Sequence, residues 1–153
     1  MKVWGVNRQL SKIYQIVVDT NVLVSGLRSS LGASYKLLSI LNDRRWQVNV
    51  STALLFEYEE ILKGVSKDLG LTSQEVDLAI AAICNIANFH PIFFLWRPML
   101  KDADDEFLID LALKAQADFI ITYNQRDLQP VERFGIQVVT PKQFLQIVGE
   151  IES

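Results

Sequence analysis

The feature that most constrains the fold is a pair of short apolar runs without the alternation of a half-exposed strand. Tyr14–Val18 reads YQIVV and is largely apolar and β-branched, and Phe119–Thr122 reads FIIT. Strands of this composition are buried on both faces, as in a parallel sheet covered by helices. We therefore predict an α/β fold, a three-layer α/β/α sandwich with a mostly parallel central sheet.

Further strands and helices alternate along the chain. The other predicted strands are Trp46–Val50, Pro91–Leu95 and Gln137–Val139. Helices, expected from capping residues and apolar periodicity, run over residues 35–41, 52–63, 73–88, 105–116 and onward from Pro141. With 153 residues, the chain is long enough for one domain with a sizeable core. We assign residues 14–150 to this domain and residues 1–13 to an N-terminal extension.

Composition limits the chemistry. The sequence has one cysteine, Cys84, and one histidine, His90, which excludes an internal disulfide and a zinc site of the multi-Cys/His type. Cys84 lies in an apolar helical run, so we expect its thiol to be buried. A metal would therefore be held by oxygen atoms, which favours Mg²⁺ or Mn²⁺. No apolar run reaches the ~20 residues needed to cross a bilayer, and no signal peptide is visible, so we expect no membrane partner and a cytoplasmic location.

Polar residues follow two of the predicted buried strands. Asp19, Thr20 and Asn21 come directly after the first strand, and Thr122 ends the strand FIIT. In open α/β sheets, functional groups gather at the carboxyl ends of the strands. Asp19 alone is equally well explained as a helix cap.

The helix after the second strand contributes a glutamate beside its apolar stripe. Helical spacing places Glu60 opposite the core, whereas Glu57 and Glu59 flank the stripe, so periodicity does not choose between these two. The residues expected on the core side are Leu54, Tyr58, Ile61 and Leu62.

An acidic cluster, KDADDEF, opens the next helix. One acid suits the helix dipole, but crowded carboxylates repel one another unless a cation lies among them. Asp105 has Leu108 and Ala112 on its own helical face, while Asp102 and Asp104 are better placed for a loop or solvent. Acids at several strand ends of one sheet predict a carboxylate metal site.

Four motifs resemble those of a known family in their order along the chain. IVVDTNVLVSGL, LLFEYEEIL, DADDEFLIDLALKAQADFIITYNQRDL and GIQVVTPKQFL are similar to motifs of PIN domains, most of all to the VapC-like toxin components of bacterial toxin–antitoxin systems. The resemblance covers about residues 14–148. It implies a compact α/β/α fold and a metal-dependent ribonuclease.

Carried over by motif, the resemblance implies that Asp19, Glu57 and Asp105 are catalytic and bind the metal. Many members have a further aspartate where this chain has Asn124, whose neutral amide adds no charge for a second metal. Asp127 nearby offers a charge that would compensate for this, but an ordinary loop residue that holds local backbone is the favoured reading. Groups expected to orient the ligands or to contact phosphate are Thr20, Asn21, Asp102, Thr122 and Asn124.

The implied partners are an RNA substrate, a cognate antitoxin protein and a second copy in a homodimer. Outlying phosphate contacts are expected from Arg28, Arg44, Arg45, Lys101 and Arg126. One alternative is a PIN-like interaction module that does not cut. Another is a phosphotransfer enzyme with Asp19 as nucleophile, which is disfavoured because Asn21 replaces the second acid of a DxD motif.

Overall fold

Five parallel strands form one central sheet in the computed structural model, which describes residues 12–91 and 103–153, the first three of the second range as backbone only. The strands occur in the order β3-β2-β1-β4-β5, and every pair is parallel. Their bounds are β1 Tyr14–Val18, β2 Trp46–Ser51, β3 Asn88–His90, β4 Phe119–Ile121 and β5 Gln137–Val139.

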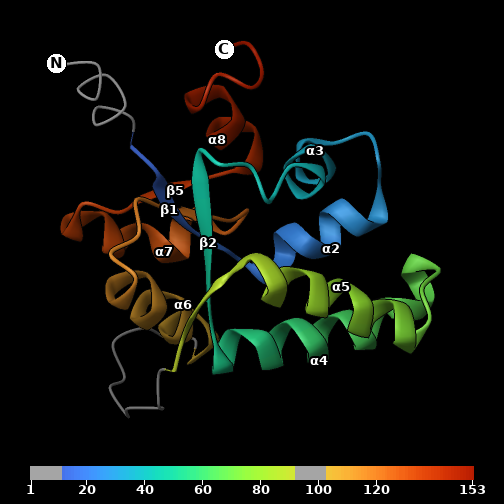
Figure 1. Cartoon of the computed structure of the whole chain (residues 1–153). Helices are drawn as coiled ribbons and strands as arrows, with labels where there is room; N and C mark the ends of the chain where they lie inside the picture. Colours follow the sequence, from blue (N-terminus) through green and yellow to red (C-terminus); the bar gives the residue numbers. More distant parts are fainter. Residues whose placement is uncertain (1–11, 92–102) are drawn as a thin grey trace, which may run out of the picture.

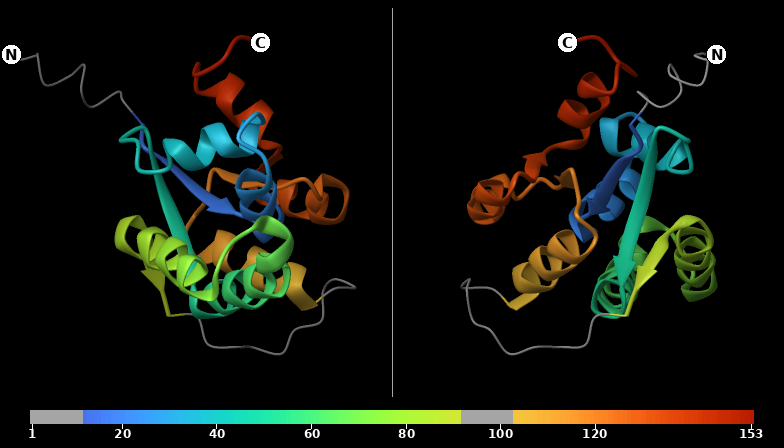
Figure 2. Two further views of the ribbon diagram at one scale, coloured as in Figure 1. Left: turned by 90° about the vertical axis from the view of Figure 1, so that its right-hand side faces the viewer. Right: turned by 60° about the vertical axis from the view of Figure 1, so that its left-hand side comes forward.

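Helices cover both faces of this sheet. Figure 1 shows α6 and α7 on one side of the strands and α2 to α5 on the other, and the views in Figure 2 agree. The predicted three-layer α/β architecture is therefore confirmed. The helices are α2 Thr20–Arg28, α3 Ala33–Ser39, α4 Thr52–Leu69, α5 Ser73–Ile86, α6 Ala103–Lys114, α7 Gln125–Leu128 and α8 Pro141–Ile147, with a 3₁₀ helix η1 at Gln129–Phe134. Within the described ranges, none of them is long and apolar enough to cross a membrane.

The core lies on both faces of the central strands, as the apolar runs predict. Residues Ile16–Val18 and Phe119–Ile121 are almost fully buried. Around them, Phe144 of α8 makes edge-to-face contacts with Trp46 and Phe119, with ring centroids 5.2 and 5.3 Å apart. These aromatic contacts join the last helix to the sheet.

The region between α5 and the sheet edge differs from the prediction. The helix expected to continue to about Asn88 ends at Ile86, and Asn88–His90 pairs with the end of β2 as the edge strand β3. Phe89 is 53% exposed, so this strand is set by backbone pairing with β2 and leaves no apolar signal in the sequence. The predicted strand Pro91–Leu95 lies, after Pro91, outside the described residues.

The prediction for the helix after β2 also needs correction. α4 continues six residues past Lys63 to Leu69 and ends at Gly70, whose φ of 72° is left-handed. Ile61 is 40% exposed, because α4 packs through the narrower stripe of Leu54, Tyr58 and Leu62.

The expectation of a buried thiol at Cys84 is wrong. α5 buries Val76 and Ile83, and Cys84 lies on its exposed side. Apolar residues of α5 extend beyond its packed face. The apolar composition of the helix therefore did not show which of its residues are buried.

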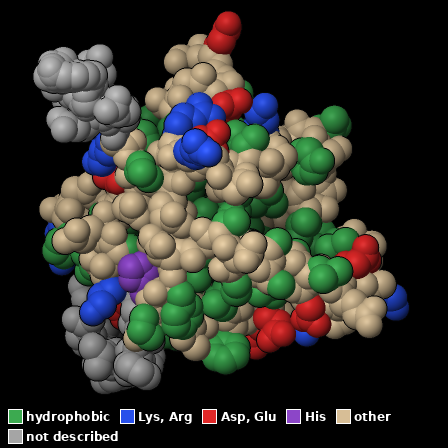
Figure 3. All heavy atoms as spheres, viewed as in Figure 1, with side chains coloured by type: hydrophobic (Ala, Val, Ile, Leu, Met, Phe, Trp, Pro, Cys, Tyr) green, Lys and Arg blue, Asp and Glu red, His purple; other side chains and the backbone are tan. Residues whose placement is uncertain are grey.

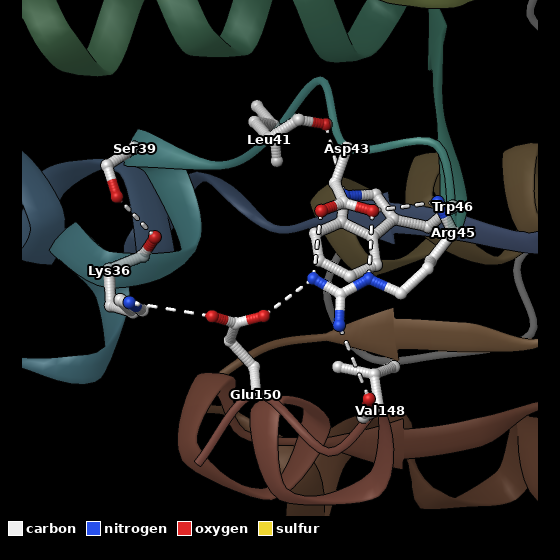
Figure 4. A network of polar contacts seen from close by, with 8 residues as sticks. All are labelled: Lys36, Ser39, Leu41, Asp43, Arg45, Trp46, Val148 and Glu150. Atoms are coloured by element: carbon white, nitrogen blue, oxygen red, sulfur yellow. Dashed lines mark hydrogen bonds and ion pairs between the residues drawn. The ribbon is translucent and has the colours of Figure 1, made fainter.

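A charged network closes the opposite end of the sheet, before β2 begins (Figure 4). Arg45 donates to both carboxylate oxygens of Asp43 at 2.9 and 2.8 Å and to Glu150 at 2.6 Å. Lys36 of α3 lies 3.6 Å from the other oxygen of Glu150. Arg44 and Arg45 precede β2 and therefore lie at its amino end, whereas Asp19 follows the carboxyl end of β1.

Asp43→Asn is expected to lower the free energy of unfolding at neutral pH by about 1 kcal/mol, the upper end for an exposed ion pair. Hydrogen bonds from the Arg45 side chain and backbone hold the pKa of Asp43 at about 2, below its ordinary 3.8. A lowered pKa stabilises the fold above pH 3.8, and this contribution is lost as the pH falls toward 2. The difference between wild type and variant in urea unfolding should shrink over that range; a pH-independent difference would contradict this role.

Candidate metal centre

Three strands end at the same edge of the sheet and bring the predicted polar residues together. Asp19 follows β1, Ser51 ends β2 and Thr122 follows β4. The Asp19 backbone N–H donates to the carbonyl of Ile121 at 2.9 Å, which ties the end of β1 to the end of β4. Asp19 is 8% exposed, and Ser51 and Thr122 are buried more deeply still.

The Asp19 carboxylate is held by hydrogen bonds on both oxygens. Oδ1 accepts from the backbone N–H of Thr20 at 2.7 Å, and Oδ2 accepts from the Thr122 hydroxyl at 2.7 Å. The amide of Asn21 donates to Oδ2 over a longer 3.4 Å. Asp19 is thus the N-cap of α2, but the contact with Thr122 lies outside what a cap requires. Each of these bonds favours the charged carboxylate.

Thr20 connects this carboxylate to α4. Its hydroxyl donates to Oε2 of Glu57 at 2.5 Å, while its backbone N–H binds Asp19. Glu59 instead pairs with Lys63, with 3.1 Å between Nζ and Oε2. The structure therefore brings Glu57, and not Glu59, next to Asp19, and resolves the choice that periodicity leaves open.

Tyr58 fixes α4 against the end of β1, and sequence reasoning gave it only a core role. Its hydroxyl donates to the carbonyl of Val18 at 2.5 Å, and the side chain is fully buried. Burial raises the pKa of Tyr58 well above its ordinary value, and the charges of Asp19 and Glu57 raise it further. The phenol stays protonated and can keep donating. The sequence signal that could have indicated this hydrogen bond was a tyrosine hydroxyl on the apolar stripe of the helix, next to Glu57.

A second group of polar residues lies on the β4 side. The Thr122 hydroxyl accepts from the backbone N–H of Asn124 at 2.9 Å, and the Asn21 side chain accepts from the backbone N–H of Tyr123 at 3.3 Å. The Tyr123 hydroxyl is 2.6 Å from that of the buried Ser34. Within the described ranges, the Asn124 side chain makes no capping hydrogen bond to α7. Sequence reasoning missed the Tyr123–Ser34 contact, because the two residues are far apart in the chain.

The acidic cluster is only partly described. Asp105 lies in the first turn of α6, a helix that contacts β1, β2 and β4, and Leu108 and Ala112 of its predicted stripe are buried. The Asp105 side chain and all of Asp102 lie outside the description, so their roles remain predictions. Asp127, on α7, is exposed.

The remaining predicted cations belong to separate segments of the chain. Arg28 is the last residue of α2, and Arg126 is exposed on α7. Lys101 lies outside the described residues.

The donor atoms suit a hard cation. Asp19 and Glu57 contribute carboxylates from two elements, and the side chains of Thr20, Asn21 and Thr122 bind them through hydroxyl and amide groups. Oxygen donors of this type match Mg²⁺ and Mn²⁺. Among the residues whose side chains are described, no group of three or more His, Cys, Asp or Glu side chains could hold a metal ion. The third ligand, Asp105, therefore stays a prediction.

Thr20→Val is expected to weaken Mn²⁺ binding by roughly 10- to 100-fold, as for other residues that hold metal ligands in place. Valine keeps the backbone N–H that binds Asp19 but removes the hydroxyl that binds Glu57. Thr20→Ser keeps both donors and should bind Mn²⁺ like the wild type. Titration calorimetry measures the difference, and equal affinities for valine and serine would exclude a positioning role for the hydroxyl.

The sequence model described as PIN domain matches residues 15–126. Among solved structures, a chain in the crystal structure of VapBC2 from Rickettsia felis, bound to a DNA fragment from their promoter, superposes with a TM-score of 0.54. The similarity covers 82% of this chain and 98% of that chain at 13% sequence identity, and at this identity it shows the fold alone. No curated protein matches the chain.

Proposed function

This chain belongs to the PIN domain family, and on that premise we propose that it is a metal-dependent ribonuclease that hydrolyses phosphodiester bonds of RNA. The observation that carries the proposal lies at the carboxyl ends of the strands. There Thr20 forms hydrogen bonds with two carboxylates, those of Asp19 and Glu57. Neighbouring carboxylates disfavour one another's charged form, and a bound cation would relieve this repulsion.

The residues proposed to hold Mg²⁺ or Mn²⁺ are Asp19, Glu57 and Asp105. When bound, the ion would polarise the phosphate of the substrate and lower the pKa of a water molecule. Thr122 and Thr20 keep Asp19 and Glu57 in place, so that little reorganisation is needed when the substrate binds. A carboxylate, Glu57 or Asp105, accepts the proton of the attacking water.

Asn124 limits the charge of the site. Its side chain is neutral, and its backbone N–H is already bound to Thr122. We propose that one cation is held firmly and that a second would be held less firmly than in family members with a fourth aspartate. Asn21 and Thr122 then act as orienting groups, and Asp102 supports the site from the acidic cluster.

The proposed partners follow from the resemblance to toxin components and from the fold shared with a chain of VapBC2. We propose a cognate antitoxin protein, a homodimer as the assembled form and action in the cytoplasm. A second candidate function, an interaction module that binds without cutting, is favoured by Asn124, because the site lacks one of the acids that active members often carry.

Calorimetric titration with Mn²⁺ and Mg²⁺, combined with cleavage of single-stranded and structured RNA, tests the proposal. We expect divalent-cation binding and cation-dependent cleavage. Cation binding without cleavage of any RNA would favour the interaction module. Loss of both signals in the intact chain would overturn the metal-dependent nuclease.

A further inference from the structure

A hollow of about 570 Å³ lies between α4 and α6, beside the candidate metal centre. Glu57, the α4 ligand of the proposed site, lines it together with Phe56 and with Phe107 of α6. Its size lies within the range of about 300–1,000 Å³ found for small-ligand sites. The hollow is therefore large enough for one or two nucleotides of a bound RNA, next to the phosphodiester bond at the metal centre.

Phe56 is the most exposed phenylalanine in the described part of the chain. It is 66% exposed although α4 has a well-packed apolar face. A single exposed apolar side chain is ordinary on a protein surface. What distinguishes Phe56 is its position, because it is next to Glu57 in sequence and its side chain lines the same hollow.

The charged groups of the hollow are unsuited to binding phosphate directly. Glu57, Glu59 and Glu60 line it, and Figure 3 shows acidic and hydrophobic side chains next to one another over α4 and α5. Lys63 is the lining residue of opposite charge, but its ammonium group lies 2.9 Å from Asp77 and 3.1 Å from Glu59. These two carboxylates raise the pKa of Lys63 and neutralise its charge locally.

A nucleotide in this hollow would thus need an uncharged contact for its base, with its phosphate held at the metal centre. Stacking of a base on an aromatic ring is such a contact, and it tolerates any base because every base has a π-face. We propose that Phe56 stacks on an unpaired base of the RNA, beside the phosphate bound at Asp19 and Glu57. This inference rests on the proposed nuclease function and adds to it a residue that contacts the base, which must be unpaired because both faces of a base are covered in a duplex.

Phe56→Ala is expected to raise KM for a single-stranded oligoribonucleotide by roughly 5- to 150-fold, the range for loss of one base–aromatic stack. The effect on kcat should be smaller, because the metal ligands are unchanged. Phe56→Trp keeps a stacking surface and should restore most of the affinity. Phe134→Ala is the matched control: this ring is 49% exposed at the end of η1, which precedes the amino end of β5.

An abasic scan of the same oligoribonucleotide identifies the stacked base. If Phe56 stacks on it, removing that base should cost the wild type about as much as Phe56→Ala. Combining the two changes should then cost little more than either alone, because both remove one interaction. Circular dichroism melting of each variant checks that the fold is intact.

The results separate this inference from the proposed function. If the wild type neither binds Mn²⁺ nor cuts RNA, the nuclease proposal fails, and this inference fails with it. If the wild type cuts but Phe56→Ala has the same KM as Phe134→Ala, the nuclease proposal stands and the stacking role is overturned. Additive costs at every abasic position would also overturn it.

Discussion

Asp19→Asn is expected to lower the rate of RNA cleavage by roughly 10³-fold, because several kcal/mol of charge stabilisation depend on a bound cation. Asparagine has nearly the same shape and can still accept a hydrogen bond from the Thr20 backbone. The substitution removes a negative charge from a residue that is 8% exposed. Thr20 links this residue to Glu57, because it forms hydrogen bonds with both. Initial rates with a labelled RNA, and Mn²⁺ titration of both proteins, measure the loss.

Asp68→Asn provides the matched control for this substitution. Asp68 is exposed near the carboxyl end of α4, far along the helix from Glu57. The control should cleave RNA and bind Mn²⁺ like the wild type. Cleavage by Asp19→Asn at the control rate would show that Asp19 is only the cap of α2.

Phe144→Ala is expected to lower the free energy of unfolding by about 3–5 kcal/mol, the usual cost of emptying a buried phenylalanine site. Phe144 is fully buried, and its ring lies between Trp46 and Phe119 at centroid distances of 5.2 and 5.3 Å. A domain is commonly stable by only about 5–15 kcal/mol, so this one change would remove a large share. Urea unfolding followed by circular dichroism measures it.

Phe134→Ala again serves as the comparison, because it deletes the same atoms from a ring that is 49% exposed. Its effect should stay within about 0.5 kcal/mol, as for most surface substitutions. Similar losses for both variants would mean that the contacts of Phe144 with Trp46 and Phe119 contribute little to stability.

The central strands could be predicted closely from the sequence because burial on both faces leaves a solid apolar run. Tyr14–Val18 is a strand with the predicted bounds, and the strand Phe119–Ile121 lies within the predicted Phe119–Thr122. β3 could not be predicted, because its three residues are placed by pairing with β2 and are mostly exposed. Tertiary pairing of this kind overrides local pattern at the edge of a sheet.

The candidate site shows the same division. The position of Asp19 followed from its place after a buried strand. The placement of Glu57 depended on a hydrogen bond from Thr20, 37 residues earlier in the chain, and helical periodicity carries no information about such a contact. The Tyr58 hydroxyl was hidden for a related reason: its partner is a backbone carbonyl of β1, which no side-chain pattern reveals.

The hydrogen bond between Asp19 and Thr122 also has a consequence for the newly made chain. These residues are 103 positions apart, and β1 lies between β2 and β4 in the sheet. During synthesis, β1 and β2 can pair early, but the carboxylate of Asp19 gains its second support only after β4 has left the ribosome. The side-chain contacts of Asp19 are therefore complete only after Thr122, residue 122 of 153, has been made and has left the ribosome.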